Sequence, residues 1–287
     1  MSGTRFLRTP AGALRAPWRL AIFVVVTFAA WGVAATVIGP LLATASAGAG
    51  LPGSGDAEAA LIGLLVGTFV GVRLVDGRPW SSVWMGRESA RGAAWVEGWL
   101  LGALAIGLPC LALIALGALR FAPSAPGSWW GAAARVTWFL LPAAMLEELL
   151  ARGYVFAVLR DGLGWRWALA VTSLGFGLLH LANHGSGVEP ITMVTLAGVF
   201  LGAIVLATGS LYAAWMAHFA WNWVMAVPLH SPVSGIPLAT PNYQLLDAGP
   251  RWLTGGTWGP EGGVAAAAGI MAGLTYLYAR RPRREES

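Results

Sequence analysis

Two adjacent glutamates, Glu147 and Glu148, lie inside a long apolar stretch of the sequence, residues 136–159. A carboxylate at membrane depth costs about 2.5–3.5 kcal/mol on insertion scales, so ionisable residues in such segments usually serve a function. Held away from bulk water, a carboxylate can act as a general base near neutral pH. The pair therefore indicates acid–base chemistry within an apolar segment.

Further polar side chains follow at helical spacing. Arg152 lies four residues after Glu148, so the two can pair on one helical face, acid first. Glu147 projects about 100° away from Glu148 and is free to face elsewhere. The same spacing joins Phe176 with His180, and His218 with Asn222. A single polar residue of this kind is readily explained by an interhelical hydrogen bond that serves packing. The whole set is not, and we predict that it forms one buried, hydrated pocket near the bilayer middle.

The predicted pocket favours hydrolysis by an activated water. Glu147 can remove a proton from a water that His180 also holds, and that water can attack a carbonyl carbon. His218 and the Asn222 amide can donate hydrogen bonds to the developing oxyanion. The set has no side-chain nucleophile of its own.

Two common hydrolase motifs are absent from the sequence. There is no G-x-S-x-G stretch, and residues 180–184 read H-L-A-N-H, without the glutamate of a zinc H-E-x-x-H motif. Two histidines and a carboxylate still form a known zinc set. A divalent metal such as zinc, bound by Glu147, His180 and His218, therefore stays open.

The composition is that of a membrane protein with several spans. Of 287 residues, 57% are hydrophobic and only 11% are charged, unlike the average soluble domain. No polar block is long enough for a separate domain, so residues 1–287 are expected to form one integral membrane domain. The basic residues are all arginine and lie mainly in loops and tails, which reports membrane orientation rather than nucleic-acid binding.

Apolar runs near or above the roughly 18 residues that cross a bilayer recur along the chain. The predicted fold is an all-α, polytopic transmembrane bundle of about eight helices. Their expected ranges are 18–44, 59–75, 95–119, 136–159, 167–181, 190–207, 210–227 and 262–278. Both tails and the loops that carry most arginines then share one side, which the positive-inside rule makes cytoplasmic, although Arg120 and Arg135 oppose this scheme.

Several other features of the sequence have simpler interpretations. A-S-A at 45–47 resembles a signal-peptide cleavage site, but the preceding apolar run is long, so we expect a retained first helix. The single cysteine, Cys110, lies in an apolar run and is expected to serve packing. His184 is expected in a loop and His230 to be incidental. Many tryptophans, Trp258 among them, lie near segment ends, where such rings settle at lipid headgroups.

Three motifs in this order resemble those of the CPBP family of intramembrane proteases. This family comprises CAAX proteases and bacteriocin-processing enzymes, the membrane-embedded Abi group that includes the type II CAAX prenyl endopeptidases. Its E-E-x-x-x-R, F-x-x-x-H and H-x-x-x-N motifs read here E-E-L-L-A-R at 147–152, F-G-L-L-H at 176–180 and H-F-A-W-N at 218–222. The resemblance covers a protease core of about 136–227, and the first three and last helices carry none of it.

The resemblance implies a peptidase that cleaves membrane-associated proteins or peptides from a cytoplasm-facing cavity. Glu147 and His180 would activate the water, while His218 and Asn222 would stabilise the oxyanion. Glu148, Arg152 and Phe176 would order the site. The family has been described both as metalloproteases and as metal-independent glutamate proteases, and we favour the metal-independent mechanism.

The sequence leaves the substrate open. It can be a prenylated CAAX protein, or a leader or bacteriocin-like peptide, since the composition is typical of a high-GC bacterial product and indicates the bacterial cytoplasmic membrane. The expected partners are the lipid bilayer and a membrane protein or peptide substrate, no nucleic acid is expected, and the oligomeric state is undetermined. Two alternatives are a catalytically silent immunity or scaffold protein of the same fold and a small proton- or cation-coupled transporter.

Overall fold

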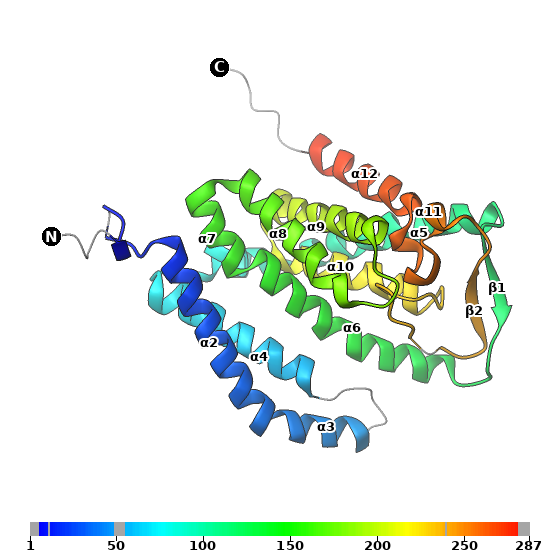
Figure 1. Cartoon of the computed structure of the whole chain (residues 1–287), viewed down its shortest axis with the longest axis horizontal. Coiled ribbons are helices and arrows are strands. Elements are labelled where there is room, and N and C mark those ends of the chain that lie inside the picture. The colour runs from blue at the N-terminus through cyan, green and yellow to red at the C-terminus, as the bar shows by residue number, and fades with distance from the viewer. Residues whose placement is uncertain (1–5, 11, 49–54, 239, 281–287) are drawn as a thin grey trace.

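The computed structural model describes residues 6–10, 12–48, 55–238 and 240–280, which form a helical bundle with one short sheet (Figure 1). The predicted helical class is confirmed. The longer helices are α2 (Ala16–Val37), α3 (Gly39–Gly48), α4 (Asp56–Phe69), α5 (Gly92–Ala115), α6 (Trp129–Arg152), α7 (Tyr154–Leu163), α8 (Trp165–Leu179), α9 (Val188–Thr208), α10 (Leu211–Ala226) and α12 (Val264–Ala279), and α11 (Arg251–Thr254) is one turn. Arg5 and the arginines at 281, 283 and 284, on which part of the predicted orientation depends, lie outside the described residues.

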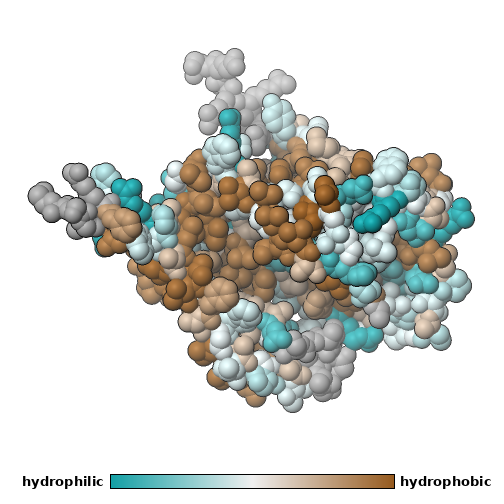
Figure 2. Space-filling view, in the orientation of Figure 1, coloured by the Kyte–Doolittle hydropathy of each residue, from teal (hydrophilic) through white to brown (hydrophobic). Residues whose placement is uncertain are grey.

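Among the described residues, four helical segments are long and apolar enough to cross a membrane. They are Ala16–Val37, Asp56–Val75, Gly92–Ala115 and Val188–Thr208. The other predicted spans fall on shorter or more polar helices, so the number of eight stays a prediction. Apolar residues cover a broad central area of the face seen in Figure 2, as expected where lipid replaces water.

The predicted span 136–159 is wrong as one continuous helix. Helix α6 starts earlier, at Trp129, and ends at Arg152, and α7 starts at Tyr154. Gly153 separates them with φ −81° and ψ −126°, which is not helical. A Cβ atom added there would lie 2.2 Å from the Leu149 carbonyl oxygen, so only glycine fits this tight break.

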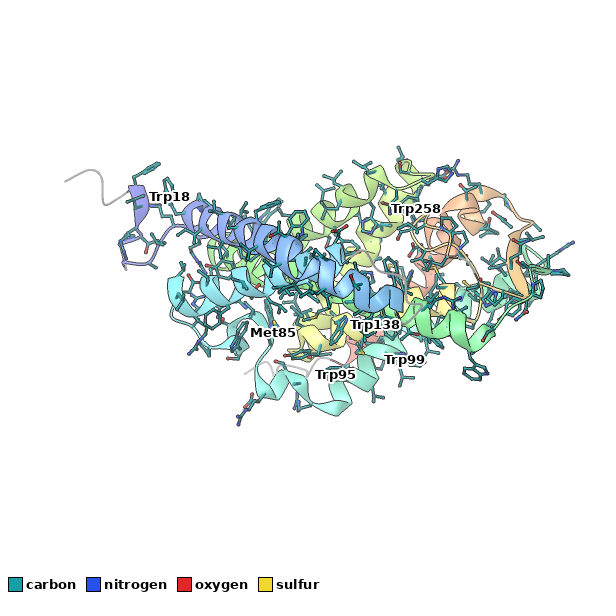
Figure 3. The ribbon with its side chains drawn as sticks, turned by 90° about the horizontal axis from the view of Figure 1, so that it is seen from below. Trp18, Met85, Trp95, Trp99, Trp138 and Trp258 are labelled. Atoms are coloured by element: carbon teal, nitrogen blue, oxygen red, sulfur yellow. The ribbon has the colours of Figure 1, made fainter. Side chains whose placement is uncertain are left out.

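Three other expectations about local structure need correction. The first predicted span is divided into α2 and α3 at Ile38. Two loop segments pair as an antiparallel sheet, β1 (Leu119–Pro123) with β2 (Tyr243–Asp247), at the end of the molecule opposite the amino terminus (Figure 1). Trp258 does not face lipid but is fully buried, unlike Trp99 on α5 (Figure 3).

Helix α10 is the centre of the bundle and packs against α5, α6 and α9. Its contact with α5 depends on small residues, because Cβ atoms added at Gly98 and Gly102 would lie 2.0 and 1.9 Å from the carbonyl oxygens of Ala213 and Ala217. Close approach of this kind is the usual basis of helix packing in membranes. Since α10 is surrounded by protein, it can carry polar residues that lipid would exclude.

Candidate active site

The three motifs meet at one place in the bundle. Glu147 and Glu148 lie near the end of α6, and His218 and Asn222 lie one turn apart on α10. The predicted span 167–181 placed His180 inside a helix, but α8 ends at Leu179. His180 is the first residue of the 3-10 turn His180–Ala182 that follows it. The His180 ring therefore projects from the point where the chain leaves helix α8 and enters a turn.

Glu147 faces both histidines. Its Oε2 atom lies 3.7 Å from Nε2 of His180 and 3.9 Å from Nε2 of His218. These distances exceed a direct hydrogen bond, and they suit a third atom that contacts all three groups. The Glu147 side chain as a whole is 32% exposed, but the Oε2 atom that faces the histidines is buried and has no hydrogen-bond partner among the described residues.

The partners of the two rings determine which nitrogen atoms face Glu147. His180 Nδ1 lies 2.8 Å from the Phe176 carbonyl oxygen, which can only accept, so Nδ1 donates. His218 Nδ1 lies 2.9 Å from Oε1 of Glu148 and donates to that carboxylate. In the neutral rings, both Nε2 atoms then carry a lone pair directed towards Glu147.

Glu148 is the centre of a separate, buried network. The predicted pair with Arg152 is present, with 3.0 Å between Oε1 and Nη1, and the side chains are 0% and 1% exposed. The same Oε1 accepts the bond from His218, a contact that the sequence analysis did not predict. Arg152 also donates to the Gly198 carbonyl oxygen at 2.8 Å and lies 4.5 Å above the Phe176 ring. Glu148 thus orients the His218 ring, while α9 and α8 hold Arg152.

A small cavity of about 20 Å³ adjoins the two histidines, and Asn222 and Phe176 line it too. A cavity of this size has room for about one water. The Asn222 amide can donate a hydrogen bond into it from a position one turn after His218. Three of the four predicted catalytic residues, His180, His218 and Asn222, thus line one small cavity whose other walls are mostly apolar. Glu147 does not line it, but its carboxylate faces the same two histidine rings.

Glu261 and Ser234 also line this cavity, and the sequence analysis missed both. Glu261 is 7% exposed, and its Oε2 accepts a bond from Trp221 Nε1 at 2.7 Å. Its Oε1 accepts from the backbone N and the hydroxyl of Ser234, at 2.6 and 2.7 Å. The Ser234 carbonyl in turn accepts from Asn183, three residues after His180, at 2.9 Å. Glu261 therefore connects α10 and the turn after α8 to the loop around Ser234. The sequence offers one indication of this role, which is that Glu261 is an isolated acidic residue beside the last apolar run.

The two remaining histidines lie away from the cavity lining. His184 is in a turn, as predicted. His230 was expected to be incidental, but it is 6% exposed, stacks on Tyr243 with 3.8 Å between ring centroids, and donates from Nδ1 to the Tyr243 carbonyl at 2.6 Å. It attaches the loop after α10 to β2, which is a structural role.

The three groups that face one another fit a metal ion by type. Around a tetrahedral zinc, ligand atoms lie about 2.0–2.1 Å from the metal and hence about 3.4 Å from each other. The separations of 3.7 and 3.9 Å are slightly wider. Among the described residues, no group of three or more His, Cys, Asp or Glu is already arranged at metal-binding distances. The donor types therefore suit zinc, but the structure does not bring them to metal-binding distances.

Comparison with protein families identifies the segment that carries this geometry. Residues 128–224 match the family model described as Type II CAAX prenyl endopeptidase Rce1-like. The resemblance inferred from the motifs is thereby confirmed for that segment, which includes the three motifs but neither Ser234 nor Glu261. Neither the curated proteins nor the solved structures gave a significant match.

Proposed function

We propose that this chain is an intramembrane endopeptidase that hydrolyses peptide bonds of membrane-associated proteins or peptides, CAAX-type substrates first among them. The observation that carries the proposal is the convergence of the Glu147 carboxylate and the Nε2 atoms of His180 and His218 within the Rce1-like segment. Three basic groups around one point are suited to hold and activate a water. The Rce1-like family is a protease family, which supports this use of the site.

In the proposed reaction, Glu147 takes a proton from the water as the water oxygen bonds to the carbonyl carbon. The electron pair of the C=O bond moves to the oxygen, and the Asn222 amide donates to this oxyanion. The tetrahedral intermediate collapses, the C–N bond breaks, and the protonated Glu147 returns its proton to the leaving amine. Because Nδ1 of His218 donates to Glu148, its Nε2 can donate to the oxyanion only when the ring carries a second proton.

Glu147, His180 and His218 would hold a divalent metal if one binds, and it would polarise the water. The work of the other residues is the same in both cases. Glu148 orients His218, and Arg152 balances the charge of Glu148. The bundle excludes bulk water from the buried side of the site.

We further propose that both termini face the cytoplasm of a bacterial cell. The start of α2, the end of the segment after α4, and the end of α7 come together, since Arg19 and Arg78 both bond Asp161, and Arg19 also bonds Asp76. Arg280, at the end of α12, bonds Glu97, near the start of α5. Segments that the arginine distribution predicts on one side thus form two groups of neighbours, which supports a common side for the members of each group.

The test is cleavage by the purified full chain in proteoliposomes. An internally quenched, farnesylated CAAX peptide is the first probe, and its unprenylated form measures the importance of the lipid group. Glu147→Gln keeps the shape but cannot accept the proton, so we expect cleavage to fall at least about 100-fold. Glu189→Gln, at an exposed position in the first turn of α9, is the matched control and should leave the rate unchanged.

Equal cleavage by wild type and Glu147→Gln would refute the mechanism. A chain that cleaves neither peptide but carries proton or cation flux would support the transporter alternative. Metal analysis of the active protein, with and without a chelator, separates the two versions of the water-activation step.

A further inference from the structure

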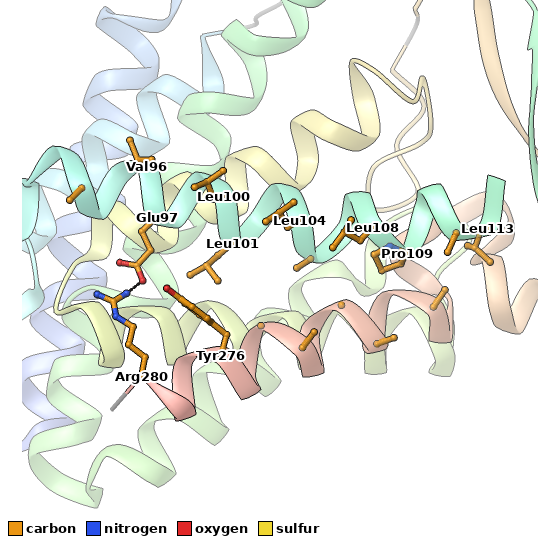
Figure 4. Close-up of a pocket in the computed structure, with 18 residues that line it drawn as sticks. Val96, Glu97, Leu100, Leu101, Leu104, Leu108, Pro109, Leu113, Tyr276 and Arg280 are labelled. Atoms are coloured by element: carbon orange, nitrogen blue, oxygen red, sulfur yellow. Dashed lines mark ion pairs between the residues drawn. The ribbon is translucent and has the colours of Figure 1, made fainter. Parts of the chain in front are cut away.

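A much larger cavity lies outside the active site, as a crevice between α5 and α12 (Figure 4). Its volume is about 1100 Å³, just above the usual range for ligand pockets. It shares no lining residue with the cavity beside His180 and His218. The crevice is therefore a separate feature of the surface.

Small side chains create the crevice. The two helices touch where Gly269 meets Ala105, since a Cβ atom added at Gly269 would lie 1.7 Å from the Ala105 carbonyl oxygen. Along the rest of its lining, α12 contributes almost only alanine and glycine, and α5 contributes leucines such as Leu104 and Leu108, which are 52% and 58% exposed. Helix α5 is a candidate membrane span and α12 is apolar throughout, so the crevice faces lipid and an occupant must be apolar along most of its length.

One end of the crevice is charged. The ion pair of Glu97 with Arg280 spans it, with Tyr276 beside the pair (Figure 4). The Arg280 side chain is 49% exposed, against 19% for Glu97, and a guanidinium has five N–H donors, so some remain for a second anion. In the sequence, Arg280 begins the run R-R-P-R-R. Basic clusters directly after a membrane helix on the cytoplasmic side attract anionic lipids.

We propose that this crevice binds one anionic glycerophospholipid of the cytoplasmic leaflet. One of its two acyl chains lies between α5 and α12, and its phosphate accepts hydrogen bonds from Arg280 beside Glu97. Charge selects this occupant, because a prenyl group or the apolar face of a second copy would place nothing anionic against Arg280. Separation from Glu147 also argues against the substrate, since the crevice does not reach the site where the bond would be cleaved.

The test uses the full-length protein, delipidated in detergent and titrated separately with phosphatidylglycerol and phosphatidylcholine. Native mass spectrometry counts the lipids that stay bound and gives their apparent affinities. We expect one retained phosphatidylglycerol and several-fold weaker retention of phosphatidylcholine. Arg280→Gln should weaken phosphatidylglycerol binding about fivefold, whereas Arg120→Gln, at an exposed position on β1, should not change it.

A second pair of variants tests the place of the acyl chain. Ala272→Phe fills the crevice from an exposed position and should weaken both lipids, and Ala268→Phe, one turn earlier, repeats the test if the first variant folds poorly. Met271→Phe is the matched control, because Met271 is a 57% exposed neighbour that does not line the crevice.

Equal retention of the two lipids, or equal effects of Ala272→Phe and Met271→Phe, would overturn the proposal. Displacement of the lipid by the farnesylated peptide would assign the crevice to a prenyl chain, and dimer formation on delipidation would assign it to a second copy; each also overturns it. None of these readouts depends on cleavage, so this proposal and the proposed protease function fail independently.

Discussion

Replacement of Arg152 by methionine should be among the most destabilising single changes in this protein. Arg152 is the cationic partner of Glu148, whose side chain is 0% exposed. Methionine fills much of the same space but donates no hydrogen bond. The Glu148 carboxylate then keeps only the bond from His218 Nδ1, and its charge stays buried without a balancing cation.

The depth of the pair sets the magnitude. An exposed ion pair contributes about 0–1 kcal/mol, but removing one partner of a buried pair costs about 3–5 kcal/mol. The Arg152 side chain is 1% exposed, so the second range applies. Loss of the contact between the Arg152 guanidinium and the Phe176 ring, 4.5 Å apart, acts in the same direction.

The assay is reversible unfolding of the purified protein in detergent micelles. Arg160→Met is the control, because Arg160 pairs with Asp161 while 30% exposed and should lose no more than about 1 kcal/mol. The double variant Glu148→Gln/Arg152→Met removes both buried charges, yet the Gln oxygen can still accept from His218 Nδ1. We expect the double variant to be more stable than Arg152→Met alone, because a buried pair replaced as a whole costs little.

The reasoning is refuted if the losses of the single variants Glu148→Gln and Arg152→Met simply add in the double variant. Additive losses would mean that the Glu148 charge is not the cause of the instability. Recovery of stability without full recovery of cleavage is the expected pattern. The Phe176 ring would still lack its contact with Arg152, and a neutral Gln oxygen holds His218 less strongly than a carboxylate does.

Three further predictions concern other parts of the molecule. Glu261→Gln presents an N–H donor where an acceptor is needed, so either Trp221 or Ser234 loses its hydrogen bond. The free energy of unfolding should fall by about 1.5–3 kcal/mol, and cleavage should fall with it. Unchanged values of both would contradict the network around Glu261. Burial raises the pKa of Asp161, but hydrogen bonds from Arg78 and Arg19 outweigh burial and hold the pKa below its ordinary 3.8. The ionised Asp161 should therefore stabilise the protein fully above pH 3.8, and this contribution should be lost as the pH falls towards the lower pKa of the folded protein. When the free energy of unfolding is measured against pH, it should fall less steeply in acid for Asp161→Asn than for the wild type. Gly102→Val should separate α5 from α10, and the free energy of unfolding should fall by about 1–3 kcal/mol or the chain should fail to fold. Gly107→Val on the same helix should be tolerated in the same unfolding measurement, because a Cβ atom added there meets only the Val224 side chain, at 3.7 Å.

The positions of the helices could be predicted well where apolar runs are long and bounded by glycine or polar residues. The range 190–207 became α9, Val188–Thr208, and the range 210–227 became α10, Leu211–Ala226. The break at Gly153 could not be predicted, because the apolar pattern continues through it. Its non-helical backbone depends on how α6 and α7 pack against the rest of the bundle, which local composition does not record.

Contacts between residues four apart on a helix could also be predicted, and contacts between helices could not. The pair Glu148–Arg152 follows from helical spacing alone. The bond from His218 to Glu148 joins residues 70 apart, and the bond from Trp221 to Glu261 joins residues 40 apart. Nothing in one sequence indicates such pairings.

The sequence by itself determined that this is an apolar, helical membrane protein and which polar residues share a helical face, because both properties depend on local composition and on a period of 3.6 residues. Only the tertiary structure decided the environments of the two adjacent glutamates. Packing of α10 and α8 against the end of α6 places Glu148 in a buried network with Arg152 and leaves Glu147 before the two histidine Nε2 atoms. The physical reason is that a helix separates neighbouring side chains by about 100°, but only the packing of other helices determines what each side chain meets.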